Sequence, residues 1–239
     1  MVGAMRKLVA LALAAAATPA AAAERSYSVT DFDRVSVEGP YVVHLVTGRP
    51  SAARASGSTE SLDRVVIDVN GGTLRIRRNR DYWGGNDGAQ EGVVTIELTT
   101  RELRSARLIG PGTLAIDRLQ GLRADIAVEG SGRLTAANVA ADNLSIGLAG
   151  SGRIELAGTA GTLRADIQGS GDVDGARLIA QEATLTTTTT GTIALAAARA
   201  ANVTALGVGN VTISGRAACT VRGPGAGQVR CGPAGALPR

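Results

Sequence analysis

The chain has 239 residues, of which 44% are apolar and 2% are aromatic, and its formal net charge at pH 7 is +4. The few aromatic residues argue against the stacking platforms that bind single-stranded nucleic acid, and a single histidine, His44, excludes a multi-histidine metal site. The apolar residues are mainly Ala, Val, Leu and Ile, so the chain is not of the disordered class. Small aliphatic side chains should fill the core of a thin and regular fold.

Residues 1–23 have the features of a signal peptide. Arg6 and Lys7 form a basic start, residues 8–17 are continuously apolar, and alanines follow Thr18-Pro19, with cleavage favoured before Glu24. The apolar run is too short for a membrane span, which takes about 20 residues. The sequence therefore predicts a protein exported to the periplasm, the cell surface or the medium, and not an integral membrane protein.

The charge of the mature chain gives no argument for a nucleic-acid partner. Removal of residues 1–23 takes away two of the 25 basic residues and leaves 23 against 21 acidic ones. Nucleic-acid affinity depends on a surplus of positive charge that neutralises phosphates. We therefore expect no nucleic acid among the partners.

Residues 24–105 form a predicted N-terminal part that is rich in strands but irregular. Gly39-Pro40 turns into an apolar segment at 41–46, residues 65–77 indicate a hairpin around Asn70-Gly71-Gly72, and a further strand is expected at 93–98. His44 falls within a predicted strand, which favours a structural role over a catalytic one. Arg75 and Arg77 alternate with apolar residues and indicate a solvated strand face, with contact to an anionic glycan or a lipid headgroup as the alternative.

The Gly-rich segment 79–92 holds Tyr82 and Trp83, two of the five aromatic residues. Aromatic rings in a polar loop can stack on sugar rings, so both residues are candidate ligand contacts. The alternative is that they fold back to cover one end of the structure.

A repeat occupies residues 106–215. Gly-Ser-Gly occurs at 130–132, 150–152 and 169–171, with degenerate triplets at 110–112, 189–191 and 207–209, so successive copies are 18 to 20 residues apart. A fixed period of this size is the signature of a stacked repeat architecture. Apolar residues recur at alternate positions on both sides of each triplet, which indicates strands with one buried face.

The expected fold is all-β: a single-stranded parallel β-solenoid, or β-helix, with right-handed coils of about 20 residues, an irregular N-terminal part and a C-terminal cap over residues 216–239. The glycines of each triplet should point inward or turn a corner. Ser131, Ser151 and Ser170 should form an outward ladder beside Arg133, Arg153 and Asp172, and the three serines are candidate ligand contacts. A phosphate-binding loop is disfavoured because a strand, not a helix, follows each triplet.

Cys219 and Cys231 are the two cysteines of the chain. An even number in an exported protein favours a disulfide. Two free thiols, or half of a metal site, are the alternatives.

Several segments together resemble a known family. The pattern Phe32-x-x-Val35-x-Val37-x-Gly39-Pro40-x-x-Val43, then Gly72-x-Leu74-x-Ile76 and the Gly-Ser-Gly series are similar to the bacterial putative autotransporter adhesin head domain, or GIN domain, over about residues 31 to 215. The resemblance implies an exported β-solenoid with an adhesive or envelope role, and the family offers no catalytic residues.

The predicted function is that of a non-enzymatic cell-envelope protein: an adhesin-like binding or scaffold module for an unidentified envelope component or glycan, without cofactor or metal. The alternative is a β-helix polysaccharide lyase or hydrolase in which Asp172 and Asp174 act as acid and base. These two carboxylates share one face of one strand, and aromatic sugar platforms are scarce. Calcium binding at 169–174 is disfavoured because neighbouring repeats lack the acids.

Overall fold

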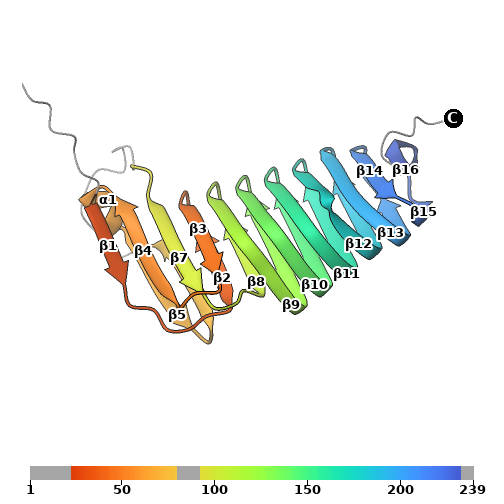
Figure 1. The fold of residues 1–239 in the computed structure, drawn as a ribbon. Helices are drawn as coiled ribbons and strands as arrows, with labels where there is room; N and C mark the ends of the chain where they lie inside the picture. The colour runs from red at the N-terminus through yellow and green to blue at the C-terminus, as the bar shows by residue number, and fades with distance from the viewer. Residues whose placement is uncertain (1–22, 80–91, 233–239) are drawn as a thin grey trace, which may run out of the picture.

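The computed structural model of the protein describes residues 23–79 and 92–232, and these residues form an elongated all-β molecule with almost no helix (Figure 1). The predicted signal peptide lies, apart from Ala23, outside the described residues. Within the described part of the chain, no helix has the length and apolar character that crossing a bilayer requires.

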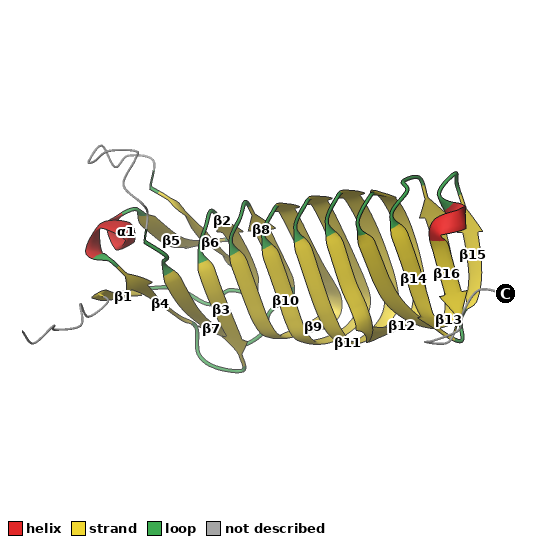
Figure 2. Cartoon of the chain, turned by 90° about the horizontal axis from the view of Figure 1, so that it is seen from above, coloured by secondary structure: helices red, strands yellow, loops and turns green. Residues whose placement is uncertain are grey.

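The repeat region is a parallel β-solenoid of about six turns, as the sequence predicts (Figure 2). One long strand follows each of the first five glycine triplets, and each pairs in parallel with the strand of the next repeat. These strands are β9 (Thr113–Gly130), β10 (Arg133–Gly150), β11 (Arg153–Gly169), β12 (Asp172–Thr189) and β13 (Thr192–Ala205). The shorter elements β14 (Asn210–Gly215), β15 (Ala218–Arg222), η1 (Ala226–Gln228) and β16 (Val229–Gly232) complete the C-terminal end.

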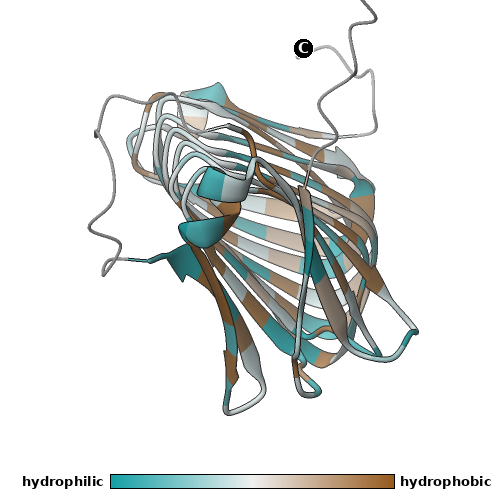
Figure 3. Cartoon of the chain, turned by 90° about the vertical axis from the view of Figure 1, so that its left-hand side faces the viewer, coloured by the Kyte–Doolittle hydropathy of each residue, from teal (hydrophilic) through white to brown (hydrophobic). Residues whose placement is uncertain are grey.

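Each coil has two faces. The first half of β9 pairs with β3 (Val42–Thr47) and its second half pairs with β8 (Ser105–Ile109). β13 is divided in the same way, because its first half pairs with β14 and its second half pairs with β15. We call the face that follows each triplet the first face and the face that precedes the next triplet the second face. Viewed from the N-terminal end, the two faces enclose the interior (Figure 3).

The core consists of aliphatic columns that run along the solenoid axis. Leu114 pairs in register with Leu134, Leu134 with Ile154, and Ile154 with Val173. These side chains are at most 2% exposed. The columns confirm the inward positions expected from the sequence, and they explain why the core needs few aromatic residues.

The glycine triplets form the turns between the second face of one coil and the first face of the next. Gly130, Gly150 and Gly169 have φ angles of 104°, 119° and 109°, which side chains other than glycine rarely adopt. They turn the corner and are exposed, whereas the second glycine of each Gly-Ser-Gly triplet is buried. The sequence predicts that the glycines of each triplet point inward or turn a corner. In the structure the first glycine turns the corner and the second lies in the interior.

Part of the N-terminal region continues the same stack. β2 (Arg34–Glu38) pairs in parallel with β8, and β3 with β9, so the turn at Gly39 lies directly against that at Gly110. β6 (Thr73–Arg78) and β7 (Thr95–Thr100) extend the second and first faces by one further strand each.

Antiparallel strands close the N-terminal end. β4 (Ala52–Gly57) pairs with β7, β1 (Ala23–Tyr27) with β4, and β5 (Val65–Asn70) with β6. The short helix α1 (Thr59–Asp63) lies between β4 and β5 in the chain. The β5–β6 pair is the hairpin predicted around Asn70-Gly71-Gly72, and both of its glycines have positive φ.

Candidate functional site

Ser131, Ser151 and Ser170 lie exposed at three successive turns, along one edge of the solenoid. The Ser151 N–H donates to the Gly130 carbonyl at 3.0 Å, and the Ser170 N–H donates to the Gly150 carbonyl at 2.9 Å. These bonds fix Ser151 and Ser170 above the preceding turns. The backbone therefore places the three hydroxyls in a regular outward row, which we call the serine ladder.

A row of charged residues on the first face runs beside the serine ladder. Arg133, Arg153 and Asp172 pair in register on neighbouring strands. Arg153 contacts Asp172 at 2.8 Å, and Arg133 contacts Glu155 at 3.3 Å. The side chains of both arginines are about half exposed, so these ion pairs contribute little stability and leave the groups accessible to a ligand.

The environment of Asp172 does not favour proton donation. The Thr192 N–H donates to its carboxylate at 2.9 Å, and this bond, together with Arg153, lowers the pKa of Asp172. A general acid in glycoside cleavage needs a raised pKa instead. Asp174 lies on the same face, as expected, and accepts a bond from the Ala176 N–H at 3.2 Å. The pair is therefore better explained as part of the surface network than as an acid and a base.

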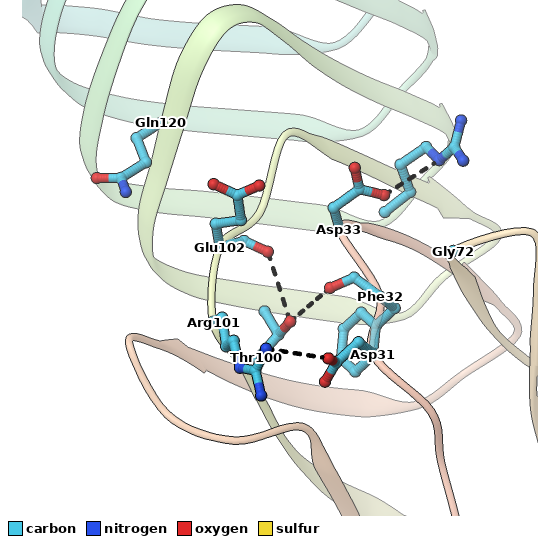
Figure 4. A pocket seen from close by; sticks show the side chains of 9 residues that line it. Asp31, Phe32, Asp33, Gly72, Thr100, Arg101, Glu102 and Gln120 are labelled. Carbon is cyan, nitrogen blue, oxygen red and sulfur yellow. Dashed lines mark hydrogen bonds and ion pairs between the residues drawn. The ribbon is translucent and has the colours of Figure 1, made fainter.

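A pocket of about 630 Å³ opens at the N-terminal end, where four separate segments meet (Figure 4). Asp31, Phe32 and Asp33 come from the segment before β2, and Thr100, Arg101 and Glu102 come from the end of β7 and the segment after it. Arg34, Gly72 and Gln120 complete the lining. The Thr100 hydroxyl donates to the Phe32 carbonyl at 2.5 Å and joins the two main segments.

The carboxylates of this pocket are paired with arginines, two of which (Arg34 and Arg101) line it, while the third, Arg104, lies outside the lining. Each of its three carboxylates contacts at least one arginine. The pairs are Asp31 with Arg101 at 3.3 Å, Asp33 with Arg34 at 3.5 Å and with Arg104 at 3.7 Å, and Glu102 with Arg104. The Arg104 guanidinium donates a hydrogen bond to the Glu102 carboxylate, and this bond raises the pKa of Arg104. Such a lining offers hydrogen-bond donors and acceptors to a neutral polar group.

Sequence patterns did not reveal this pocket, because its residues are far apart in the chain. Phe32 and Gly72 belong to the pattern that carries the family resemblance, and that pattern is the one available signal. Within the described residues, His, Cys, Asp and Glu form no group of three that could hold a metal ion.

The other predicted positions are distributed over the molecule. Tyr82 and Trp83 lie outside the described residues, and their role as ligand contacts stays a prediction. His44 is exposed on the first face, between Glu97 and Ala115 in register.

Cys219 and Cys231 form a disulfide, as favoured by the sequence. The bond joins β15 to β16, which lie at the C-terminal end of the molecule (Figure 1), whereas the pocket is lined by segments next to β2 and β7. It therefore belongs to the closure of the solenoid.

Comparison with known proteins points to one family and one fold. A family model described as "Putative auto-transporter adhesin, head GIN domain" matches residues 31–217. No curated protein matches the chain.

Solved structures with the same fold include three bacterial proteins. A putative adhesin from Bacteroides fragilis is 18% identical, with a TM-score of 0.75, and the match covers 90% of this chain and 98% of the other. A protein named putative lipid binding protein, from Parabacteroides distasonis, is 22% identical, with a TM-score of 0.66 and coverage of 89% and 97%. A putative adhesin from Parabacteroides merdae is 15% identical, with a TM-score of 0.62 and coverage of 90% and 96%.

Proposed function

The chain belongs to the head GIN domain family of putative auto-transporter adhesins, and on this basis we propose that it is an exported, non-enzymatic module that binds an envelope glycan through its serine ladder. The proposal takes export from the predicted signal peptide at residues 1–23. The disulfide is compatible with it, because such bonds persist outside the reducing cytosol.

The observation that supports the binding role is the periodic exposure of Ser131, Ser151 and Ser170. Neighbouring strands in a sheet lie about 4.8 Å apart, so the ladder offers the same hydroxyl at closely and evenly spaced points. A polymer with repeating hydroxyl or carbonyl groups can contact several of them at once. Because linked contacts reinforce one another, individually weak hydrogen bonds then suffice for binding.

Binding of the mature protein to isolated cell envelopes and to a glycan array tests this proposal. We expect the triple variant Ser131→Ala, Ser151→Ala and Ser170→Ala to bind at least about fivefold more weakly, because three hydrogen bonds are lost. A matched control replaces Ser145, Thr188 and Thr220, three exposed hydroxyl residues of the second face, by Ala. Equal binding of the two triple variants would remove the serine ladder from the proposal.

Two further experiments test the aromatic ligand contact and the enzyme alternative. Tyr82→Ala and Trp83→Ala on the same array test the aromatic contact predicted from the sequence. An assay for new reducing ends on a panel of acidic polysaccharides tests the enzyme alternative. Turnover that disappears in Asp172→Asn would contradict the non-enzymatic role.

A further inference from the structure

Three arginines from three different strands meet on the second face near the N-terminal end. Ser36 of β2 pairs in register with Arg75 of β6 on one side and with Arg107 of β8 on the other. Arg34, two residues before Ser36, lies in the same way between Thr73 and Ser105. The surface there is hollowed by about 260 Å³. We call this set, Arg34, Ser36, Thr73, Arg75, Ser105 and Arg107, the arginine hollow.

The arginine hollow carries a surplus of positive charge. Glu38 is the one carboxylate residue among the residues that line it, against three arginines. Arg107 contacts Glu129 at 3.6 Å, and Arg34 contacts Asp33 at 3.5 Å. Arg75 makes no ion pair with the described residues, although Asp68 of β5 lies opposite it in register and contacts Arg77 at 3.8 Å. The side chains of Arg34 and Arg107 are 52% and 56% exposed, so their charges face the solvent.

Part of the hollow is held in place before any ligand arrives. The Arg34 guanidinium donates to the Gly71 carbonyl of the β5–β6 turn at 2.5 Å. Ser36, Thr73 and Ser105 are side chains of paired strands and are half-buried. A ligand therefore meets groups whose backbone positions the sheet has already fixed, which lowers the entropic cost of binding.

The chemistry of the hollow is that of an oxyanion site. Guanidinium groups present paired N–H donors that match the oxygens of a carboxylate, sulfate or phosphate, and charged hydrogen bonds are about twice as strong as neutral ones. The hydroxyls of Ser36, Thr73 and Ser105 add neutral donors between the arginines. We infer that the arginine hollow binds the anionic groups of an acidic polysaccharide, an inference that rests on the proposed glycan-binding function and names the ligand class.

A soluble polymer fits this surface better than a lipid membrane does. The large apolar residues that are exposed in the described part of the chain are Val46, Val93, Leu122, Ile179, Leu206 and Val208. None of them lines the arginine hollow. Membrane-surface binding combines charge with apolar side chains that enter the bilayer, and the hollow lacks the second component.

The surface also leaves room for a polymer to continue along the solenoid. The row of Ser36 and Arg107 proceeds in register through Ala127 and Gly147, both with little or no side chain. No atom lies within 4 Å of the point where a Gly147 Cβ would stand. A chain bound by the arginines can therefore extend over β9 and β10 in this row, as far as Asp166 of β11, which follows Gly147 in register.

Calorimetric titration of the mature protein with polygalacturonate, dextran sulfate and neutral dextran tests the inference. We expect binding to the two polyanions and none to dextran, with an affinity that falls as salt is added. Arg75→Ala and Arg107→Ala should each weaken polyanion binding about tenfold, because a charged hydrogen bond is lost. Arg75→Lys should show an intermediate loss of polyanion affinity, since lysine keeps the positive charge but lacks the paired N–H donors of the guanidinium.

Arg222→Ala is the matched control, because Arg222 is exposed in the same row of the second face, but on β15 at the other end. Equal losses in Arg75→Ala and Arg222→Ala would overturn the inference in favour of unspecific charge attraction. Binding to phosphatidylglycerol vesicles without binding to the soluble polyanions would overturn it in favour of a lipid surface. If the mature protein binds cell envelopes but not the soluble polyanions, the inference about the arginine hollow is overturned and the proposed glycan-binding function stands. If it binds neither cell envelopes nor polyanions, the inference and the proposed function are both contradicted.

Discussion

Thr187 occupies an inward position that is aliphatic in the neighbouring coils. It pairs in register with Ile167 and with Ala205, and it is 2% exposed. Its hydroxyl is buried without a hydrogen-bond partner in the described structure. A buried polar atom without a partner costs free energy, because it has given up its bonds to water.

We therefore expect Thr187→Val to stabilise the protein. Valine keeps the shape of the side chain and removes the unpaired hydroxyl, so the free energy of unfolding should rise by about 1 kcal/mol. The corresponding increase in the melting temperature is about 2–4 °C, which thermal unfolding followed by circular dichroism can measure.

Thr189 supplies the control for this prediction at the residue scale. It is also buried, but its hydroxyl donates to the Gly169 carbonyl at 3.1 Å and accepts from the Gly191 N–H at 3.0 Å. Thr189→Val should therefore lower the melting temperature, since both bonds are lost. Destabilisation by Thr187→Val of the same size would show that the hydroxyl of Thr187 is satisfied.

At the scale of the coil, two glycines three residues apart should respond in opposite ways to alanine. Gly150 has a φ of 119°, and a Cβ there would lie 2.5 Å from the Gly130 carbonyl oxygen. Gly147 lies in open space on the second face. We expect Gly150→Ala to destabilise the protein by about 1–3 kcal/mol or more, and Gly147→Ala to be neutral or stabilising by up to about 1 kcal/mol.

Urea unfolding of both variants measures the two effects on one strand, β10. A small effect of Gly150→Ala would mean that neighbouring turns move apart easily, contrary to the close stacking of Gly130 and Gly150. A large loss in Gly147→Ala would show that this position is packed against something that the described residues do not include.

The repeat could be predicted from the sequence because one local rule fixes it. Leu134 and Ile154 stand four residues after the first glycine of their triplets, so the spacing of the triplets gives both the strand and its register. Gly39-Pro40-Tyr41 forms the same kind of turn, and the Gly39 N–H donates to the Ile109 carbonyl at 3.0 Å. Its place in the stack was not predictable from spacing, since β4 to β7 intervene between Gly39 and Gly110.

The candidate sites divide in the same way. The outward direction of Ser131, Ser151 and Ser170 followed from their positions within the period. Arg75 and Arg107 become neighbours of Ser36 through the pairing of β2 with β6 and β8, which no short-range pattern specifies. The pocket around Asp31 and Glu102 likewise depends on segments that are distant in sequence. Periodic sites are thus readable from the sequence, whereas sites made by the N-terminal strands require the structure.

At the scale of the whole molecule, the two ends of the solenoid are closed by different means. The antiparallel strands β1, β4 and β5 close the N-terminal end. In the last coil, Cys219, Val221 and Val229 are half-buried, although they continue columns that are fully buried one coil earlier. The disulfide between Cys219 and Cys231 links β15 of the second face to β16 of the first face. It therefore holds the two faces together at the last coil that the structure describes.

This position predicts a local effect of reduction. Each coil of a solenoid contacts mainly its neighbours, so a defect at one end need not reach the other. The cysteines are 12 residues apart, and closing a loop of that size stabilises by about 3 kcal/mol in the chain-entropy model. In the double variant Cys219→Ala and Cys231→Ala we expect faster amide hydrogen exchange in β15 and β16 and unchanged exchange in β9 to β11. Mass spectrometry of peptides from both regions measures this, with the reduced wild-type protein as a second sample. Equal acceleration in all coils would instead mean that the solenoid unfolds as one cooperative unit, with the disulfide contributing to the stability of every coil.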